Sequence, residues 1–304
     1  MGDFSAGAAI GAGFRLIGRH PLAFLAWSAA YLVLGVLPQI GVMALILPEW
    51  TRLMQEVTAA GASHSPMSTA EMMRAQGGMM QLQPLSWIAG LLSQSVLLSA
   101  IYRAVLYPED RAFFYLRLGG RELWLGLVLL VLFVMACILA VAVMLPTFVM
   151  IGIIGALARG SPAMALLMIP VMVTAFGVMI WVMLRLSLAT PMSFDQRAFR
   201  LYESWDRTRG HAGKMFGVAF VLIVVVWVVE MALGGVVFGL SGGLGGLERL
   251  RGWFQHPQID LSQLMPLIVG GALVVAVFST AFFALFGAAW AEIYRELTAD
   301  LAPD

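Results

Sequence analysis

Of the 304 residues in this chain, 61% are hydrophobic and only 12% are charged, whereas a soluble domain typically carries about a quarter of charged residues. Such a chain has too few polar groups to cover the surface of a soluble protein, so hydrocarbon is its natural solvent. The net charge of +1 gives no overall attraction to nucleic acid, and the single cysteine, Cys137, excludes a disulfide framework.

Six segments of the chain are long and apolar enough to cross a membrane as α-helices, which takes about 20 residues each. In chain order they are 22–47, 85–106, 123–145, 163–184, 215–240 and 264–290. Runs such as 128–143 are apolar on every side, whereas the strands of a membrane β-barrel alternate in polarity. We therefore expect an all-α polytopic protein with one integral membrane domain over residues 1–304.

The third of these segments is followed by an unusually long uncharged stretch. No charged residue occurs between Glu122 and Arg159, and one straight helix over that run would measure about 54 Å against a hydrocarbon core of about 30 Å. Pro146 lacks a backbone donor and its ring clashes with the preceding turn, so we expect a break or a sharp kink there. A short helix at the outer surface, Phe148–Ala158, would follow.

The basic residues are distributed unevenly between the loops, and this bias predicts the orientation. With the N-terminus inside, 13 of the 18 basic residues fall in cytoplasmic segments. The five in outer segments are Arg52, Arg74, Arg159, Arg249 and Arg251. We therefore expect a bacterial-type inner (plasma) membrane protein with both termini in the cytoplasm.

A weak threefold repeat is visible in the chain. Each odd-numbered span follows a short basic segment, and the three segments are Phe4–His20, Asp110–Arg121 and Asp195–Lys214. Each mixes Arg with aromatic or leucine side chains, as in a helix that lies flat in the headgroup layer. The chain is consistent with three copies of an interfacial helix plus a transmembrane hairpin, although the need for Arg in every cytoplasmic loop would produce the same pattern.

Two motifs flank the loop between the fourth and fifth spans. The first is Arg185-Leu-Ser-Leu-Ala-Thr-Pro191 and the second is Ser204-Trp-Asp-Arg-Thr-Arg-Gly210. Over about residues 185–218 the chain resembles the six-helix membrane-domain superfamily found fused to glycerophosphodiester phosphodiesterases, which also has stand-alone members of unknown function. The resemblance implies no hydrolase activity here, because we find no soluble stretch of roughly 200–250 residues for a phosphodiesterase barrel.

One acidic residue, Glu230, falls deep inside the fifth span. An ionisable side chain at that depth costs about 2.5 kcal/mol or more and usually faces the interior of the helix bundle. Gln94 and Thr174 are expected at a similar depth, so we predict an intramembrane polar cluster of Glu230, Gln94 and Thr174. Two roles stay open for it: a protonated carboxyl that hydrogen-bonds between helices, or a relay for a proton or a substrate.

A basic patch is predicted on the cytoplasmic side, around the loop between the fourth and fifth spans. Arginine pairs with phosphate through two hydrogen bonds, and bases beside a membrane attract anionic lipid, so this patch favours binding of lipid headgroups. Orientation and anchoring alone would also account for the charges. The predicted patch consists of Arg185, Ser204, Trp205, Arg207, Arg209 and Lys214.

Three glycines near the end of the fifth span, Gly235, Gly239 and Gly243, lie four residues apart. This spacing places them on one helix face and predicts close helix packing. The four histidines lie in separate loops without the spacing of a metal site, and no nucleophile or phosphate-loop pattern is present. We therefore expect no metal, no cofactor and no enzymatic activity.

Two classes of function fit these features. Short loops and few polar residues favour a non-enzymatic inner-membrane protein that contacts lipids or a membrane partner, with a role in membrane integrity or as a scaffold. Glu230 and the basic patch motivate the alternative, a transporter or flippase-like carrier of a lipid or small amphiphile, although such carriers usually have more polar groups within the membrane. Membrane lipids are the expected partners, nucleic acid is not, and a protein partner or a homo-oligomer stays open.

Overall fold

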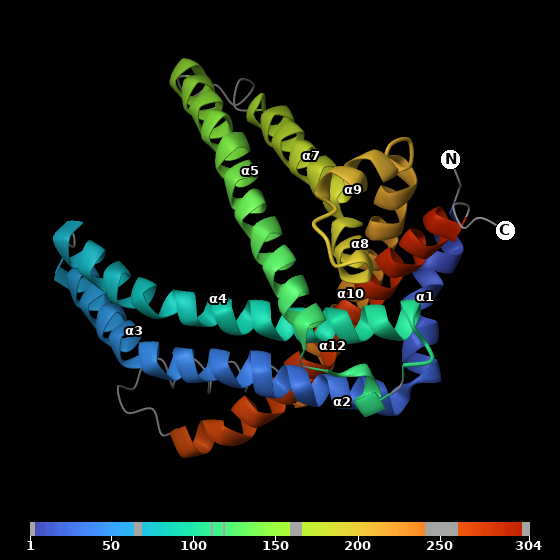
Figure 1. The fold of residues 1–304 in the computed structure, drawn as a ribbon. Helices are drawn as coiled ribbons and strands as arrows, with labels where there is room; N and C mark the ends of the chain where they lie inside the picture. The colour runs from blue at the N-terminus through green and yellow to red at the C-terminus, as the bar shows by residue number, and fades with distance from the viewer. Residues whose placement is uncertain are drawn as a thin grey trace. The chain divides into compact units, whose positions relative to one another are not determined.

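The fold is that of a computed structural model, which describes residues 4–63, 69–110, 112–117, 119–158, 166–240 and 261–299. Within these ranges the chain is helical and contains no strand, so the predicted all-α class is confirmed. Figure 1 labels the α-helices α1 (Ala6–Arg19), α2 (Pro21–Tyr31), α3 (Leu37–Ser63), α4 (Thr69–Leu106), α5 (Gly120–Ala158), α7 (Met168–Leu186), α8 (Ala189–Gln196), α9 (Leu201–Arg207), α10 (Ala212–Leu240) and α12 (Leu261–Ala299).

The described residues include six helical stretches that are long and apolar enough to cross a membrane, which confirms the predicted number. They are Pro21–Arg52, Leu82–Leu106, Ala112–Leu157, Met168–Gln196, Ala212–Gly235 and Ile268–Ala299. Many of their large apolar side chains are exposed. This is expected when hydrocarbon replaces water around the helices.

The chain divides into two compact units. The first unit contains Met1–Leu16, Ser99–Leu222 and Leu285–Asp304, and the second contains Ile17–Leu98 and Ile223–Ala284. Because α1, α4, α10 and α12 each contribute residues to both, the division falls within helices rather than in loops. The candidate site described below lies entirely in the first unit.

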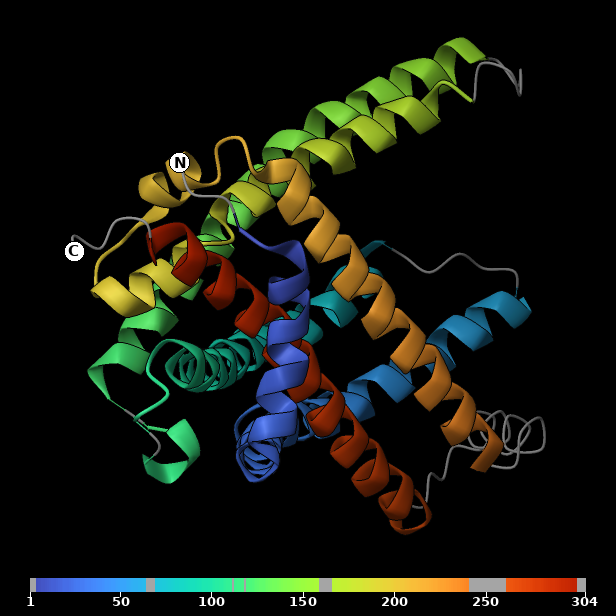
Figure 2. The same ribbon diagram turned by 90° about the vertical axis from the view of Figure 1, so that its right-hand side faces the viewer.

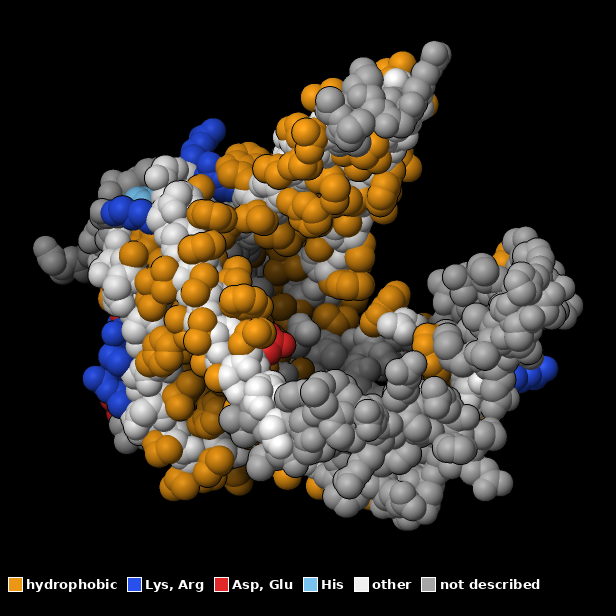
Figure 3. Space-filling view, turned by 180° about the vertical axis from the view of Figure 1, so that it is seen from behind, with side chains coloured by type: hydrophobic (Ala, Val, Ile, Leu, Met, Phe, Trp, Pro, Cys, Tyr) orange, Lys and Arg blue, Asp and Glu red, His pale blue; other side chains and the backbone are white. Residues whose placement is uncertain are grey.

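In the first unit, α5 and α7 form a hairpin and run side by side in both ribbon views (Figures 1 and 2). The short helix α8 packs against α5, and α9 packs against α7. Hydrophobic side chains cover the described part of this hairpin at the upper right of Figure 3. Ile138, Phe148 and Val173 are among its exposed apolar side chains, which is the surface expected of helices that face lipid.

Helix α5 continues without interruption through Pro146 to Ala158. The predicted break at Pro146 and the separate surface helix Phe148–Ala158 are therefore wrong, whereas a sharp kink at Pro146, the other expectation, stays a prediction. The hydroxyl of Thr147 donates to the carbonyl oxygen of Val143 at 2.6 Å. Hydroxyl-to-carbonyl bonds of this kind and adjustments by neighbouring groups make prolines tolerable inside membrane helices.

The three segments of the predicted repeat differ in local structure. The first contains α1, a helix of 14 residues, and the third contains α9, a helix of 7 residues. In the second, the described residues form a 3-10 turn, Ala112–Tyr115, before α5 begins at Gly120. Phe113 and Phe114 have φ values of 52° and 56° there, a left-handed backbone that bulky residues rarely adopt. The repeat therefore does not extend to the fold of its second basic segment.

In the second unit, α2 passes into α3 through one wide π-helical turn, Leu32–Val36. The N–H of Leu37 bonds to the carbonyl of Leu32, five residues earlier. Pro38 follows directly, and in a regular α-helix its ring would meet the carbonyl of Leu34, four residues before it. The wide turn relieves this clash, which accounts for its position.

This turn lies against α4 within the second unit. A Cβ at Gly35 would stand 3.1 Å from Oγ of Ser93, so the glycine permits the close contact. The side-chain amide of Gln39 donates to the carbonyl of Ser86 at 3.0 Å, about one turn further along α3 and two turns earlier in α4. A small residue and one interhelical hydrogen bond are the two devices by which helices associate in lipid.

Candidate anion-binding site

An open pocket of about 610 Å³ lies where α4 ends and α5 begins. Its walls come from the last turn of α4, the segment that joins α4 to α5, the first turns of α5 and the residue that follows α8. The lining residues are Arg103, Asp110, Arg117, Gly119, Gly120, Arg121, Glu122, Trp124 and Arg197. Four arginines face two carboxylates, which leaves a surplus of two positive charges.

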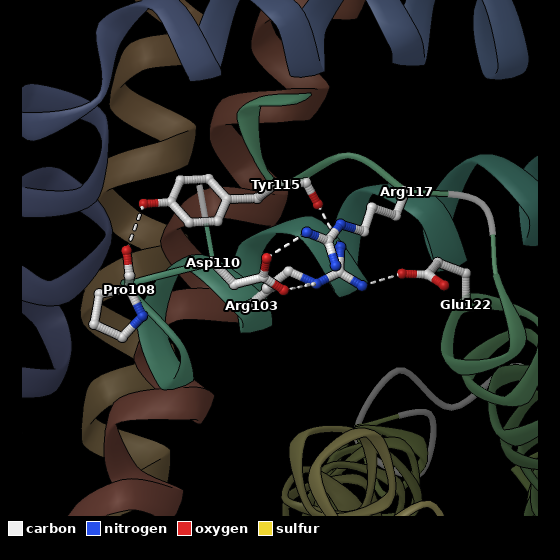
Figure 4. Close-up of polar contacts among 6 residues, drawn as sticks. All are labelled: Arg103, Pro108, Asp110, Tyr115, Arg117 and Glu122. Atoms are coloured by element: carbon white, nitrogen blue, oxygen red, sulfur yellow. Dashed lines mark hydrogen bonds and ion pairs between the residues drawn. The ribbon is translucent and has the colours of Figure 1, made fainter. Parts of the chain in front are cut away.

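Arg103 forms the floor of this pocket and is only 3% exposed. Its guanidinium bonds to Glu122 and to the carbonyl of Tyr115, and its Nε lies 3.7 Å from Oδ2 of Asp110. Figure 4 shows the guanidinium between the two carboxylates. Each of its three nitrogens therefore has a partner, as burial of a charge requires. Arg103 holds the pocket together rather than offering a free donor to a ligand.

The two carboxylates are placed by the segment that leads into α5. Glu122 stands in the first turn of that helix, where the helix dipole favours a negative charge. A Cβ at Gly119 would lie 3.2 Å from Oε2 of Glu122, so a glycine there leaves room for the carboxylate. Asp110 pairs with both Arg103 and Arg117 (Figure 4). The result is a network of two arginines and two carboxylates with no net charge.

Arg121 and Arg197 supply the surplus positive charge. Among the described residues no ion pair joins either of them to a carboxylate. The Cζ atom of Arg121 lies 5.3 Å from the ring centroid of Tyr107 and 6.0 Å from that of Phe194. Its Nε is buried without a hydrogen-bond partner, as is the indole nitrogen of Trp124. Donors that stay unmatched at the wall of a pocket are suited to an anionic ligand.

The position of α8 at the pocket is fixed by Asp195. The hydroxyls of Tyr107 and Tyr294 both donate to this carboxylate, the second at 2.6 Å. Burial, together with the hydrogen bond to Asp195, raises the pKa of Tyr107, so its phenol remains a donor at neutral pH. Phe194 and Arg197 lie on either side of Asp195 in the chain. The same contacts therefore hold the Phe194 ring beneath Arg121 and place Arg197, the second surplus arginine, at the pocket.

A second arginine cluster, the tryptophan clamp, consists of Arg185, Trp181 and Trp205. The Cζ atom of Arg185 lies 5.4 Å from the Trp181 ring and 5.6 Å from the Trp205 ring. The two indoles meet edge to face with centroids 5.2 Å apart. Cation–π attraction of this kind is stronger where water is excluded. The clamp fastens the end of α7 to α9.

The backbone of Arg185 is held by the second sequence motif. Oγ of Ser204 donates to the Arg185 carbonyl at 2.8 Å, and Oγ1 of Thr208 does so at 3.4 Å. Thr208 also donates to the carbonyl of Ser204 at 2.9 Å. Both hydroxyl residues are fully buried. The two motifs that carry the family resemblance therefore meet in space, and Thr208, which we did not select as a site residue, is part of the contact.

The predicted basic patch is thus only partly one cluster. Arg185, Ser204 and Trp205 come together in and around the clamp. Arg207 instead reaches α12, where its guanidinium donates to the carbonyl of Leu297 at 3.4 Å. Arg209 and Lys214 are exposed at the junction of α9 and α10.

The predicted intramembrane cluster of Glu230, Gln94 and Thr174 stays a prediction. Thr174 is exposed and donates to the carbonyl of Pro170 in its own helix at 2.8 Å. Glu230 is exposed on α10, and Gln94 is half-buried on α4. Within the described part of the second unit, no hydrogen bond joins Glu230 to Gln94.

Close packing at the glycine face of α10 also stays a prediction. No described atom lies within 4 Å of where a Cβ would stand on Gly235 or Gly239. Gly243 lies outside the described residues.

Comparison with known proteins adds no assignment: no protein-family model, curated protein or solved structure matches the chain. Over the described residues, no group of three or more His, Cys, Asp or Glu side chains could hold a metal ion. The chemistry of the pocket therefore rests on its own side chains. Guanidinium groups, two of them without a carboxylate, and two unmatched buried nitrogens equip it to bind an anion.

Proposed function

We propose that this protein is a non-enzymatic protein of a bacterial-type inner membrane that binds anionic phospholipid headgroups at its cytoplasmic face, in a membrane-integrity or scaffold role. The observation that carries the proposal is the surplus of two arginines in the pocket at the start of α5. Arg121 and Arg197 present guanidinium groups beside helices that are long enough to span a bilayer. Arginine matches phosphate with two parallel hydrogen bonds, and the phosphate of a lipid lies at this level of the membrane.

Contacts within the first unit support placing both ends of the chain and the segment between α9 and α10 on the same side of the membrane. The backbone N–H of Ser5 donates to Glu296 at 2.7 Å, and the ring of Phe4 lies 5.9 Å from that of His211. The N-terminal segment, α12 and the segment between α9 and α10 are therefore in contact. The excess of arginine in these segments favours the cytoplasm as their compartment.

The resemblance to the membrane-domain superfamily of glycerophosphodiester phosphodiesterases belongs to the same proposal. It is supported by the six spans and by the contact between the two motifs at Arg185. The resemblance implies a fold, and it implies no hydrolase activity.

A lipid-retention experiment tests the proposal. Purified protein in nanodiscs with equal amounts of phosphatidylglycerol and phosphatidylcholine is released into mild detergent, and the retained lipids are counted by native mass spectrometry. Wild type should retain phosphatidylglycerol preferentially. Arg121→Gln combined with Arg197→Gln should lower this retention at least tenfold, since a hydrogen bond to a charged group contributes about 1.5–3 kcal/mol and tenfold is about 1.4 kcal/mol.

The control variant also removes two positive charges, one at the end of α1 and one in the part of α12 that belongs to the first unit. Arg19→Gln combined with Arg295→Gln changes two exposed arginines outside the pocket and should leave the retention unchanged. Equal retention by the pocket variant and wild type, with the fold of both intact, would reject headgroup binding at this site. An equal loss in both double variants would show that net charge alone attracts the lipid.

One observation favours the alternative, a transporter or flippase-like carrier. Glu230 is exposed on a stretch of α10 that lies inside a predicted span, and an ionisable group at such a depth is commonly functional. Transfer of a fluorescent phospholipid across proteoliposomes checks this function. A carrier that uses the carboxyl should lose transfer in Glu230→Gln, whereas no transfer by wild type would exclude the alternative.

A further inference from the structure

A second concave surface of the first unit lies between α7 and the start of α10. It is a groove of about 650 Å³, and its walls are apolar side chains and two glycines. Figure 2 shows α10 beginning beside the end of α7. Phe176 and Trp181 line the groove from α7, and Phe216 lines it from α10. All three side chains are exposed, so within the described first unit the groove stands open.

We propose that this groove holds one acyl chain of a membrane phospholipid, with the lipid phosphate beside Arg209 and Lys214. The site is separate from the arginine-lined pocket, with which it shares no residue. The inference therefore does not depend on headgroup binding at Arg121 and Arg197.

The length and location of the groove fit an acyl chain. Its residues on α7 extend from Ile169 to Leu184, a rise of about 22 Å at 1.5 Å per residue. One leaflet of hydrocarbon is half of a core of about 30 Å, so the groove is long enough for one chain. Both walls belong to stretches that are long and apolar enough to span the membrane. The material that surrounds such a surface is lipid.

Charge at one end of the groove identifies which part of a lipid lies there. Gly213 and Phe216 belong to its wall, and Lys214 stands between them in the first turn of α10, exposed. Arg209 is exposed in the short connection that precedes this helix. At the same end, Trp181 lies against the guanidinium of Arg185. Tryptophan beside basic residues is typical of the headgroup level of a membrane, so the headgroup lies at this end and the chain extends along α7.

Two glycines make the groove wide and provide the test. Gly177 and Gly213 both line it, and nothing lies within 4 Å of where a Cβ would stand on either. A Cβ at Gly177 therefore meets no described protein atom, and we expect a larger side chain there to extend into the groove. Gly217 on α10 is equally open but is not part of the groove, which makes it a matched control.

The experiment uses the full chain in nanodiscs with phosphatidylglycerol that carries a photoactivatable diazirine in one acyl chain. After irradiation, labelled peptides are quantified by mass spectrometry. Peptides of residues 172–184 should be labelled several-fold more than the exposed apolar face of α5, residues 131–145. Gly177→Phe should lower the labelling of α7 at least fivefold, and Gly217→Phe should leave it unchanged.

Other results would overturn the inference. Equal labelling of α7 and α5, or no effect of Gly177→Phe, would mean that lipid meets this surface as it meets any other. Labelling of α5 without labelling of α7 would mean that protein rather than lipid covers the groove. The Arg121→Gln, Arg197→Gln variant separates the two proposals: groove labelling that persists in it supports the acyl-chain site whether or not the pocket binds headgroups.

The position of the headgroup has its own measurement. Arg209→Gln combined with Lys214→Gln should remove the preference of groove labelling for phosphatidylglycerol over phosphatidylcholine probes, while total labelling remains. A preference that survives the double change would place the phosphate elsewhere.

Discussion

Two arginines of the first unit, Arg103 and Arg185, are withdrawn from water in different ways. Arg103 is buried against two carboxylates and a carbonyl, so its charge is neutralised by opposite charge. Arg185 has no carboxylate partner among the described residues and lies instead against two indole rings. The first arrangement tolerates deep burial, whereas the second suits a half-buried side chain near lipid headgroups.

The comparison separates structural arginines from those available to a ligand. In Arg103 every nitrogen has a partner, and in Arg185 the faces of the guanidinium are covered. Arg121 is stacked on aromatic rings like Arg185 but faces the pocket, and Arg197 is exposed beside it. Charge alone therefore does not distinguish a structural arginine from one that is available to a ligand. The groups that contact each guanidinium make this distinction.

The largest effect is expected where opposite charge is removed from Arg103. Glu122→Gln leaves a buried guanidinium without its main counter-charge, and loss of one partner of a buried ion pair typically costs about 3–5 kcal/mol. We expect a loss near the lower end, because Asp110 remains 3.7 Å away. Unfolding in detergent micelles measures the effect. Asp110→Asn, at a partly exposed carboxylate, should cost less than about 1 kcal/mol, and equal losses would contradict the central role of Glu122.

A smaller effect is expected in the clamp. Arg185→Lys keeps the charge but loses the planar stacking on Trp181 and Trp205, and should destabilise the protein by about 1–2 kcal/mol. The same change at Arg207, whose hydrogen bond among the described residues is a long one to the carbonyl of Leu297, is the control and should be nearly neutral. Unfolding free energies measured in detergent micelles compare the two variants. A neutral Arg185→Lys would mean that charge rather than stacking holds α7 to α9.

The hydroxyls that meet the Arg185 carbonyl should show coupled effects. Ser204→Ala and Thr208→Val should each cost about 0.5–1 kcal/mol, because the carbonyl keeps one donor in each single variant. The double variant leaves it with neither and should cost more than the sum by about 0.5 kcal/mol. A double-mutant cycle of unfolding free energies tests this, and strict additivity would argue against a shared acceptor.

The smallest effect on stability is expected for the surplus arginines. Arg121→Gln combined with Arg197→Gln removes no described ion pair, and should change the unfolding free energy by about 0.5–1 kcal/mol through the cation–π contacts of Arg121 with Tyr107 and Phe194. Measurement in detergent without added lipid isolates this quantity from lipid binding. A large destabilisation would mean that these arginines, like Arg103, stabilise the fold.

Sequence periodicity predicted the membrane class and the number of spans, because hydrophobic runs of about 20 residues are strong local signals. It was wrong about a break at Pro146, because whether a proline ends a membrane helix depends on its surroundings in the fold rather than on composition. The wide turn at Leu32–Val36 was also not predicted. Pro38 is a signal for it, because in a regular α-helix its ring would clash with the carbonyl of Leu34, four residues earlier.

The pocket was beyond sequence analysis for a different reason. Arg103 and Glu122 are separated by 19 positions, and their pairing depends on the left-handed turn at Phe113 and Phe114, which no propensity indicates. Arg197 comes from a third region of the chain. The clamp was partly predictable, because the two motifs drew attention to Arg185, Ser204 and Trp205, but only the fold shows that they contact one another.

The length of α5 has a consequence for the bilayer. A helix of 39 residues measures about 58 Å, nearly twice the hydrocarbon thickness, and its far end keeps apolar side chains such as Phe148 and Leu157 exposed. Tilting alone would require about 60°, beyond the usual range of 0–40°. Such hydrophobic mismatch is relieved by thickening the surrounding bilayer or by bending the rod, so the protein should accumulate in the thicker regions of its membrane and stiffen the lipid around it.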